Sequence, residues 1–257
     1  MILDHPSVNR AIFFPRPTDL NPDLVVEVGS GIRLACYVRK GRRQSGIVVH
    51  FHGSAELASE HATHNAALFL SMGVGVCFLE YRGYGRSTGT PALAAMRGDG
   101  EKVVQALGVD PRQVVAFGRS LGSLYAIELA NRLPGIAGLV LESGTAYVGK
   151  NRALRDALAR LGQSEERLTQ ELKSEFDLQE KLGKYRGALL VLHTEHDQIL
   201  GRSHAERLHA WGGGTDKRLV IFPTGNHNTI LRANFPEYLR EVTEFLGRVG
   251  VRPARGV

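Results

Sequence analysis

Hydrophobic residues along the chain gather in short runs that alternate with amphipathic segments of helical period. The runs rich in β-branched residues predict eight strands, at 24–29, 32–38, 46–51, 74–80, 113–118, 138–142, 188–193 and 218–222. Apolar residues three and four positions apart predict helices at 57–71, 92–107, 121–132, 203–211 and 230–248. From the third strand onward this alternation is typical of a parallel sheet with helices on both faces, so we expect an α/β protein.

Two segments depart from the alternation. The first two strands are separated only by Gly29-Ser30-Gly31, which is too short for a crossover helix, so they should form an antiparallel hairpin at one edge of the sheet. Residues 145–186 are longer than one crossover helix and contain an amphipathic pattern over Arg152–Arg160. We interpret residues 1–257 as a single α/β domain with a helical cap inserted at about 145–186.

Composition and charge favour a globular protein without a nucleic-acid partner. The 257 residues are 43% hydrophobic and 23% charged, which is ordinary for a chain with a large core. The net charge of +6 could suit nucleic acid, but the Lys and Arg residues are scattered. Their densest cluster, Arg39-Lys40-Gly41-Arg42-Arg43, is interpreted as a solvated turn between strands.

The sequence favours a cytoplasmic location. The N-terminus lacks the basic start and apolar core of a secretory signal, and no apolar run approaches the roughly 20 residues of a membrane span. Cys36 and Cys77 lie in apolar, strand-like runs, which suits two buried free thiols in a reducing compartment. A disulfide between them stays open at this level.

The most informative motif is Gly118-Arg119-Ser120-Leu121-Gly122, which joins the strand at 113–118 to the helix at 121–132. The pattern G-x-S-x-G at such a junction predicts a tight turn that presents the serine hydroxyl, with glycines where Cβ atoms would collide. The N-terminus of the helix would stabilise a developing oxyanion. The alternative is that Ser120 only caps the helix.

A serine hydroxyl needs a base, and the base needs a carboxylate that orients it. Asp197 follows the strand at 188–193, and His227 follows the strand at 218–222. Because the C-terminal ends of parallel strands share one edge, Ser120, Asp197 and His227 can converge there. Their order along the chain is the one expected for this architecture.

Other residues compete for these roles. His193 and His196 precede Asp197 and would reverse the expected order. Glu195 is a rival carboxylate two residues earlier, and Glu142, at the end of the strand at 138–142, is the main alternative to Asp197. We prefer Asp197 as the orienting carboxylate and His227 as the base.

A second backbone donor for the oxyanion is expected in the loop after the strand at 46–51. The predicted oxyanion hole is formed by the N–H groups of Leu121 and Ser54, with Gly53 or Ala55 as alternatives to Ser54. His52 is interpreted as a residue that orders this loop.

Metal and cofactor sites are not expected. The pairs His50-x-His52 and His61-x-x-His64 have no nearby Cys or carboxylate at the spacing of a zinc site. The glycine-rich segment 81–89 lacks both the Gly-Lys-Ser/Thr ending and the G-x-G-x-x-G spacing of nucleotide-binding loops. We expect its arginines, Arg82 and Arg86, to bind backbone groups or carboxylates.

Several segments together resemble the α/β-hydrolases, and within them the bud-emergence-type serine hydrolases, a branch that includes protein depalmitoylases. They are Phe51-His-Gly-Ser-Ala-Glu56, Tyr81-Arg-Gly-Tyr-Gly-Arg-Ser87, Phe117-Gly-Arg-Ser-Leu-Gly122, the strand end at Asp197, and His227-Asn228. The resemblance implies an eight-stranded, mostly parallel sheet with its second strand antiparallel. It also implies ester or thioester hydrolysis without a cofactor.

The chain departs from this branch at several positions. The branch usually has Asn where Ser54 stands and Gly where Ser123 stands. Its membrane-acting members carry an N-terminal cysteine cluster for lipidation, whereas no cysteine precedes Cys36 here. We therefore expect no membrane anchor.

The resulting hypothesis is a serine hydrolase that cleaves small-molecule carboxylic esters or thioesters through Ser120, His227 and Asp197 and an acyl-enzyme intermediate. Two alternatives stay open. One is a peptidase or amidase that uses the same three residues, and the other is a non-catalytic binding protein of the same fold.

Overall fold

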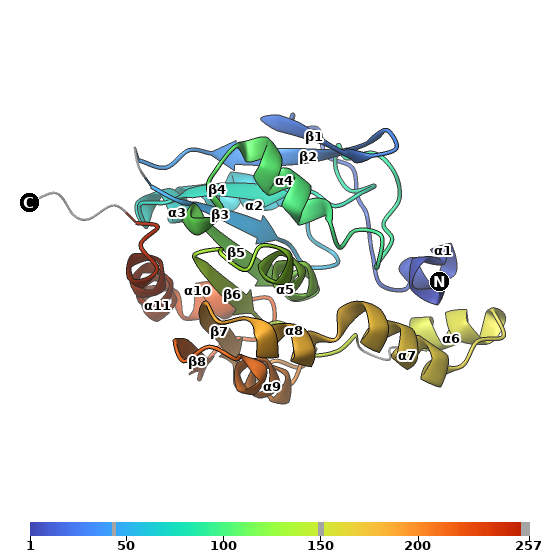
Figure 1. The fold of residues 1–257 in the computed structure, drawn as a ribbon. Coiled ribbons are helices and arrows are strands. Elements are labelled where there is room, and N and C mark those ends of the chain that lie inside the picture. Colours follow the sequence, from blue (N-terminus) through green and yellow to red (C-terminus); the bar gives the residue numbers. More distant parts are fainter. Residues whose placement is uncertain (43–44, 149–151, 253–257) are drawn as a thin grey trace, which may run out of the picture.

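The computed structural model describes residues 1–42, 45–148 and 152–252. Their eight strands form one sheet in the order β1-β2-β4-β3-β5-β6-β7-β8 (Figure 1). The strands are β1 Leu24–Gly29, β2 Ile32–Arg39, β3 Ile47–Phe51, β4 Gly75–Leu79, β5 Val114–Arg119, β6 Gly138–Glu142, β7 Ala188–Thr194 and β8 Lys217–Phe222. The predicted strands are all confirmed, each to within one residue at either end.

The sheet is mixed only at one edge. β2 pairs antiparallel with both β1 and β4, and every other neighbouring pair is parallel. The turn between β1 and β2 passes through Gly29, Ser30 and Gly31, all with positive φ, a conformation that glycine adopts without steric cost. The predicted hairpin and the implied antiparallel second strand are therefore confirmed.

Helices connect the strands and cover the sheet. They are η1 Ile2–Asp4, α1 Pro6–Asn9, α2 Ala58–His64, α3 Ala66–Ser71, α4 Asp99–Leu107, η2 Pro111–Gln113, α5 Gly122–Arg132, α6 Arg152–Arg160, α7 Glu165–Phe176, α8 Leu178–Lys184, α9 Ser203–Trp211, α10 Ile230–Ala233 and α11 Phe235–Arg248. The predicted helices at 121–132 and 203–211 correspond to α5 and α9.

Two predicted helices are each broken by an asparagine. The helix predicted at 57–71 is interrupted at Asn65, whose side-chain amide donates to His61 Nδ1 over 2.8 Å. The helix predicted at 230–248 is interrupted at Asn234, whose side-chain amide donates to two backbone carbonyls. The bond from Asn234 to the carbonyl of Ile230 competes with the helical ladder and explains the second break.

The helix predicted at 92–107 begins only at Asp99. The amides of Ala94 and Ala95 donate to the Asp4 carboxylate, over 2.9 and 3.1 Å. These donors therefore tie the segment to the N-terminus of the chain, a long-range contact that the local apolar period does not reveal.

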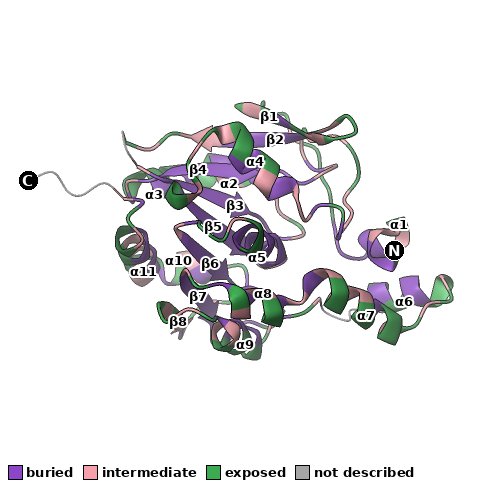
Figure 2. Cartoon of the chain, in the orientation of Figure 1, coloured by how far each residue is buried: buried purple, intermediate pink, exposed green. Residues whose placement is uncertain are grey.

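Two helical layers enclose the sheet. Helices α4, α5, α8 and α9 pack on one face, and α2, α3 and α11 pack on the other. Along β5, Val114 and Ala116 face the first layer, whereas Val115 and Phe117 face the second. Figure 2 shows the central strands buried between helices with exposed outer faces. Burial on both faces explains why these strands are continuous apolar runs.

The described part of the insertion between β6 and β7 contains three helices joined by short irregular segments. It contains the predicted amphipathic helix at Arg152–Arg160 as α6, followed by α7 and α8, and residues 149–151 lie outside the described residues. α8 packs against α5 and α9. α7 packs against the N-terminal segment, where the Leu3 amide donates to Glu171 over 3.2 Å (Figure 1).

Other expectations concern the surface and the thiols. Cys36 and Cys77 are both free and buried in neighbouring strands. In the basic cluster, Lys40 and Arg42 are exposed and follow β2, as expected for a turn, and Arg43 lies outside the described residues. Within the ranges that the structure describes, no helix combines the length and the apolar character of a membrane span.

Candidate active site

The turn that carries Ser120 has the strained geometry that its sequence predicts. Ser120 has φ +52°, and its amide donates to the carbonyl of Glu142 on β6 over 2.9 Å. A Cβ atom at Gly118 would lie 2.6 Å from the carbonyl oxygen of Gly122, and one at Gly122 would lie 2.1 Å from that of Phe51. Both glycines are therefore required by the close approach of backbone to backbone.

The structure brings the three predicted side chains together. His227 Nε2 lies 2.9 Å from Ser120 Oγ, and His227 Nδ1 lies 2.7 Å from Asp197 Oδ2. The Asp197 side chain is fully buried, and the His227 side chain is 6% exposed. A proton on Nδ1 satisfies the contact with the carboxylate and leaves Nε2 free to accept from the serine hydroxyl.

Asp197 is held as a carboxylate by its surroundings. Burial would raise its pKa, but the hydrogen bonds from His227 and from the amides of Leu200 and Ile199 outweigh burial and lower the pKa below its usual value. The two amides donate to Oδ1 over 2.8 and 2.9 Å, so Oδ2 is left for the imidazole. His227 and the two amides together therefore hold Asp197 as a carboxylate, and the loop after β7 fixes its orientation.

The rival carboxylates point elsewhere. Glu142 lies 3.1 Å from Arg119 Nε and accepts a short hydrogen bond from the Tyr238 hydroxyl. Glu195 is exposed and pairs with Arg202 at 2.8 Å. Neither carboxylate forms a hydrogen bond with an imidazole among the described residues, so the geometry favours Asp197 over the main alternative, Glu142.

The rival histidines are also occupied or remote. His193 Nε2 lies 2.7 Å from the carbonyl of Leu200 and only 3.5 Å from Asp197 Oδ2. Burial lowers the pKa of His193, which favours its neutral form. The side chain of His196 is exposed to solvent. Of the three candidate histidines, His193, His196 and His227, only His227 contacts both the Ser120 hydroxyl and the Asp197 carboxylate.

The two backbone amides of the predicted oxyanion hole, those of Leu121 and Ser54, have no hydrogen-bond partner in the described part of the chain. The amide of Gly53, an alternative to Ser54, donates to Glu56 Oε2 over 2.7 Å and is therefore occupied. The amide of Ala55 forms no hydrogen bond in the described part of the chain and stays an alternative.

The loop that carries Ser54 is held from several sides. His52 Nδ1 lies 2.8 Å from the carbonyl of Gly53, and its Nε2 lies 3.1 Å from the fully buried Glu80. The Tyr84 hydroxyl donates to the carbonyl of Ser54 over 2.5 Å. These contacts agree with the interpretation of His52 as a residue that orders the loop.

The remaining motifs have structural partners. Arg82 binds the carboxylate of Asp99 at 2.6 Å, and Arg86 donates to the carbonyl of Asp19 over 3.3 Å, as predicted for both arginines. The rings of His50 and His61 lie 4.7 Å apart between centroids. Over the described ranges, no group of three or more His, Cys, Asp and Glu side chains is arranged to hold a metal ion.

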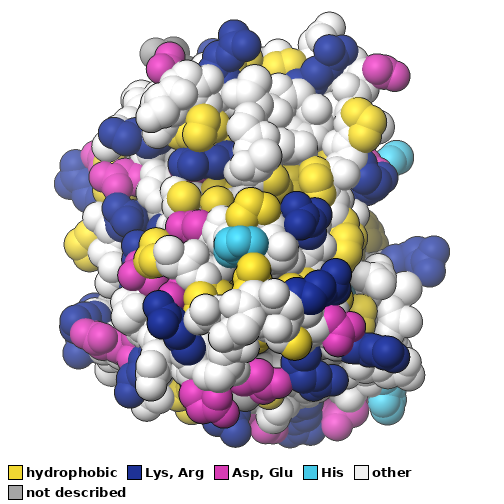
Figure 3. Space-filling model, turned by 90° about the vertical axis from the view of Figure 1, so that its right-hand side faces the viewer, with side chains coloured by type: hydrophobic (Ala, Val, Ile, Leu, Met, Phe, Trp, Pro, Cys, Tyr) yellow, Lys and Arg dark blue, Asp and Glu magenta, His cyan; other side chains and the backbone are white. Residues whose placement is uncertain are grey.

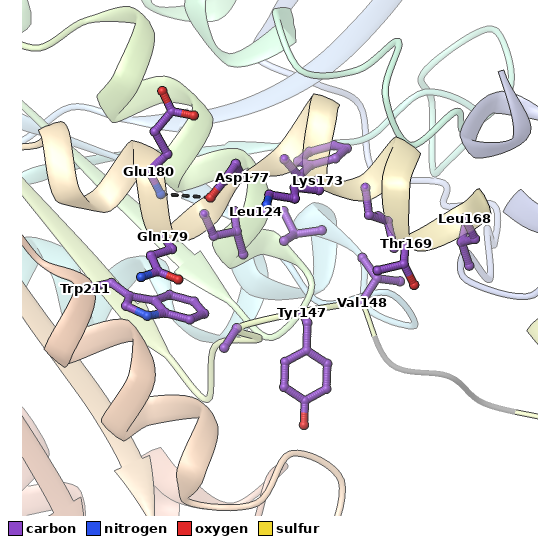
Figure 4. A pocket seen from close by; sticks show the side chains of 14 residues that line it. Leu124, Tyr147, Val148, Leu168, Thr169, Lys173, Asp177, Gln179, Glu180 and Trp211 are labelled. Atoms are coloured by element: carbon purple, nitrogen blue, oxygen red, sulfur yellow. Dashed lines mark hydrogen bonds between the residues drawn. The ribbon is translucent and has the colours of Figure 1, made fainter. Parts of the chain in front are cut away.

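A large, mainly apolar pocket of about 850 Å³ lies between α5 and the inserted helices (Figure 4). Its walls come from α5, α7, α8, the end of α9 and the segment after β6, and include Leu124, Ala146, Tyr147, Val148, Leu168, Leu172, Phe176, Leu178 and Trp211. Ser120 and His227 do not line it. The lining residue Leu124 directly follows Ser123 on α5. The hydroxyl of Ser123 donates to the carbonyl of Ser120 over 2.7 Å.

The surface around this region is partly apolar. Figure 3 views the molecule from the side on which the N-terminus, α6 and α7 lie in Figure 1. Hydrophobic side chains gather near the middle of this face, around a histidine, and Lys and Arg side chains surround them.

The fold and the site together define an α/β-hydrolase, because such proteins place a nucleophile after a central strand and its partners at neighbouring strand ends. The model of the serine aminopeptidase S33 family matches residues 42–179, more than half of the chain, so the chain belongs to this family.

Similar proteins agree with this assignment. An uncharacterised protein of Mycobacterium tuberculosis is 31% identical over 215 residues, which cover 80% of this chain and 72% of the relative. Protein bem46 of Schizosaccharomyces pombe is 25% identical over 204 residues, covering 77% of this chain and 66% of the relative. The resemblance to the bud-emergence-type hydrolases is thereby confirmed. An esterase of Pyrococcus furiosus has the same fold, with a TM-score of 0.72, 19% identity, and coverage of 91% of this chain and 99% of the esterase.

Proposed function

We propose that this hydrolase cleaves carboxylic esters or thioesters through a serine nucleophile and an acyl-enzyme intermediate. The observation that carries the proposal is the continuous contact from the Asp197 carboxylate through His227 to the Ser120 hydroxyl. The esterase of similar fold supports ester substrates for this chain. No metal or cofactor is required by the proposed reaction.

The chemistry follows from the contacts. Ser120 Oγ attacks the substrate carbonyl while His227 Nε2 accepts its proton, and Asp197 stabilises the imidazolium that forms. The N–H groups of Leu121 and Ser54 bind the oxyanion, and each such donor contributes about 3 kcal/mol in comparable sites. The imidazolium then protonates the leaving alcohol or thiol. A water molecule, activated by the same imidazole, releases the acyl group.

The apolar pocket gives a role to the predicted cap. In the proposed reaction it holds the apolar acyl or alcohol part of the substrate, between α5 and the inserted helices α7 and α8. Its volume of about 850 Å³ lies within the range of about 300–1,000 Å³ that is usual for small-molecule sites. Figure 4 shows Leu168 and Trp211 at opposite ends of the pocket, so an extended chain has room between them.

The decisive experiment is turnover of nitrophenyl esters of graded chain length, thioesters and aminoacyl amides by wild type and Ser120→Ala. We expect the variant to fold normally and to lose ester and thioester turnover by several orders of magnitude. Ser71→Ala, an exposed serine on α3, is the matched control and should retain full activity. Unchanged turnover by Ser120→Ala would refute the proposal.

The alternatives are separated by the same experiment. The description of the family as serine aminopeptidases favours an amidase or peptidase as the second candidate. Faster turnover of the aminoacyl amide than of the esters would replace the ester assignment by this one. A non-catalytic protein of the same fold would leave Ser120 unlabelled by a fluorophosphonate probe.

A further inference from the structure

Arg119 is a charged side chain that is buried directly before the nucleophile. It ends β5 and is only 8% exposed. Its Nη2 donates to the backbone carbonyl of His227 over 2.9 Å and lies 3.3 Å from the side-chain oxygen of Asn228. A buried guanidinium is unfavourable unless its donors are paired, and here the pairing is made with the loop that carries the base.

The other donors of Arg119 bind two carboxylates. Nε lies 3.1 Å from Glu142, and Nη1 forms a short ion pair with Glu56. Glu56 also lies 3.1 Å from His61 Nε2 and accepts the Gly53 amide over 2.7 Å. Burial would raise the pKa of Glu56, but the hydrogen bond from His61, the charge of Arg119 and the Gly53 amide outweigh burial and hold the pKa well below its usual value.

Glu56 thereby immobilises the backbone that precedes the second oxyanion donor. The amide of Gly53 is bound by Glu56, and its carbonyl lies 2.8 Å from His52 Nδ1. A Cβ atom at Gly53 would approach Glu56 to 3.0 Å and Arg119 to 3.1 Å, so the loop and the ion pair are closely packed. The next amide along the chain is that of Ser54.

We infer that Arg119 and Glu56 are positioning residues for catalysis, an inference that rests on the proposed function. The ion pair joins the nucleophile turn to the loop that carries the second oxyanion donor, and the same guanidinium holds the loop that carries His227. Arg119 therefore sets two distances at once. One is the distance between the N–H groups of Leu121 and Ser54, and the other is the distance between His227 Nε2 and Ser120 Oγ. Neither Arg119 nor Glu56 touches the reacting atoms.

This role predicts an effect on kcat rather than on KM. Loss of the guanidinium frees the base and the oxyanion donor to move, and a misplacement of about 1 Å can cost about 100-fold in rate. The apolar pocket is lined by α5, α7, α8 and the segment after β6, none of which contains Arg119 or Glu56. Substrate binding should therefore change little.

A second cavity makes a chemical rescue feasible. It has a volume of about 230 Å³, is lined by both polar and apolar side chains, and lies on the opposite face of the sheet from α5. Arg119, Glu56 and Glu142 line it, together with the exposed Arg232. Removal of the Arg119 side chain leaves two carboxylates beside a cavity that a small guanidinium ion can enter.

The experiment compares Arg119→Ala, Glu56→Gln and the control Arg82→Ala. Arg82 is also a largely buried arginine, with a 12% exposed side chain that binds a carboxylate, but it lies outside the proposed machinery. For each protein, kcat and KM on a nitrophenyl ester, the rate of fluorophosphonate labelling of Ser120 and the melting temperature are measured. The rates are repeated with methylguanidinium, and with urea as an uncharged control.

We expect Arg119→Ala to lose about 100-fold in kcat and in labelling rate, with KM nearly unchanged and with rescue by methylguanidinium but not by urea. Glu56→Gln should lose less, because its amide oxygen still accepts from Gly53. The double variant should lose no more than Arg119→Ala, since both changes break one ion pair. Arg82→Ala should lower the melting temperature and leave kcat intact.

Several results would overturn the inference. One is an Arg119→Ala protein with wild-type kcat and labelling rate. Another is a loss of kcat in Arg82→Ala equal to that in Arg119→Ala, which would indicate a general effect of instability. If Arg119→Ala does not fold, a wild-type kcat in both Glu56→Gln and Arg119→Lys would also overturn the inference. A wild-type protein that leaves Ser120 unlabelled would instead refute the proposed function, and the positioning role with it.

Discussion

The substitution Asp197→Asn tests the proposed catalytic contacts most directly, because the structure dictates how asparagine must sit. Oδ1 of Asp197 accepts two amides, from Ile199 and Leu200, and Oδ2 accepts from His227 Nδ1. An asparagine keeps its oxygen toward the two amides, so its NH₂ group faces the imidazole. Nδ1 must then accept, and the proton moves to Nε2, where it blocks proton transfer from Ser120.

The size of the effect follows from these contacts. Turning the asparagine over would leave two N–H donors facing its NH₂ group, at about 1–3 kcal/mol for each unsatisfied donor. The productive tautomer is therefore scarcely populated, and the imidazolium loses its neighbouring charge. We expect kcat to fall by about 10⁴, as in other serine hydrolases with this change, which corresponds to about 5.5 kcal/mol of barrier.

The assay is turnover of a nitrophenyl ester, with circular dichroism to verify that the variant is folded. Glu195→Gln is the matched control, since this exposed carboxylate binds Arg202 and lies two residues before Asp197. It should retain activity within a few-fold of wild type. A folded Asp197→Asn protein that loses less than about 10-fold in kcat would refute the reasoning from the tautomer.

Three further predictions concern stability and specificity. Because the folded pKa of Asp197 is lowered, the stability that it contributes is present above the unfolded value of about 4 and is lost as the pH falls through the folded pKa. Urea unfolding at several pH values should therefore show that wild type loses more free energy of unfolding than Asp197→Asn on acidification. Parallel plots of this free energy against pH for the two proteins would contradict the prediction. Gly122→Ala should destabilise the folded protein by about 1–3 kcal/mol, because the new Cβ atom would collide with backbone atoms. Gly247→Ala, where no atom lies within 4 Å of the new Cβ, should stabilise it by about 0.5–1 kcal/mol. Equal melting temperatures for the two variants would contradict the packing argument. Leu172→Trp should fill the apolar pocket and shift the preference toward short acyl or alcohol chains, and an unchanged chain-length profile would remove the pocket from substrate binding.

Part of the site could not be read from the sequence. Gly118-Arg119-Ser120-Leu121-Gly122 is a local pattern, and its turn depends on residues that are neighbours along the chain. The pairing of Arg119 with Glu56 and with the backbone of His227 joins residues more than 60 positions apart. No spacing rule connects these positions, so only folding reveals that a buried cation links the loops.

The same distinction applies to the helices. The predicted helices agree well with α5 and α9. α9 has a buried stripe that contains Ala205 and Leu208, whereas α5 is buried on all sides from Gly122 to Ala130. The apolar period overextends the helix that begins at Asp99, since the amides of residues 94 and 95 are bound by Asp4 from the distant N-terminus. Periodicity reports which faces are buried, whereas the end of a helix depends on what competes for its hydrogen bonds.

By itself the sequence determined the strands, the helices α5 and α9, the hairpin at the edge and the strained turn at Ser120, because each depends on residues close together along the chain. The tertiary structure decided that His227 contacts Asp197 rather than Glu142. It also decided that the Gly53 amide is occupied, whereas the amides of Leu121 and Ser54 have no partner among the residues that the structure describes. It also decided the shape of the apolar pocket. These features depend on how loops from different strands meet at the sheet edge. The linear pattern indicates which strand ends share that edge, but it does not specify which side chains and amides come into contact there.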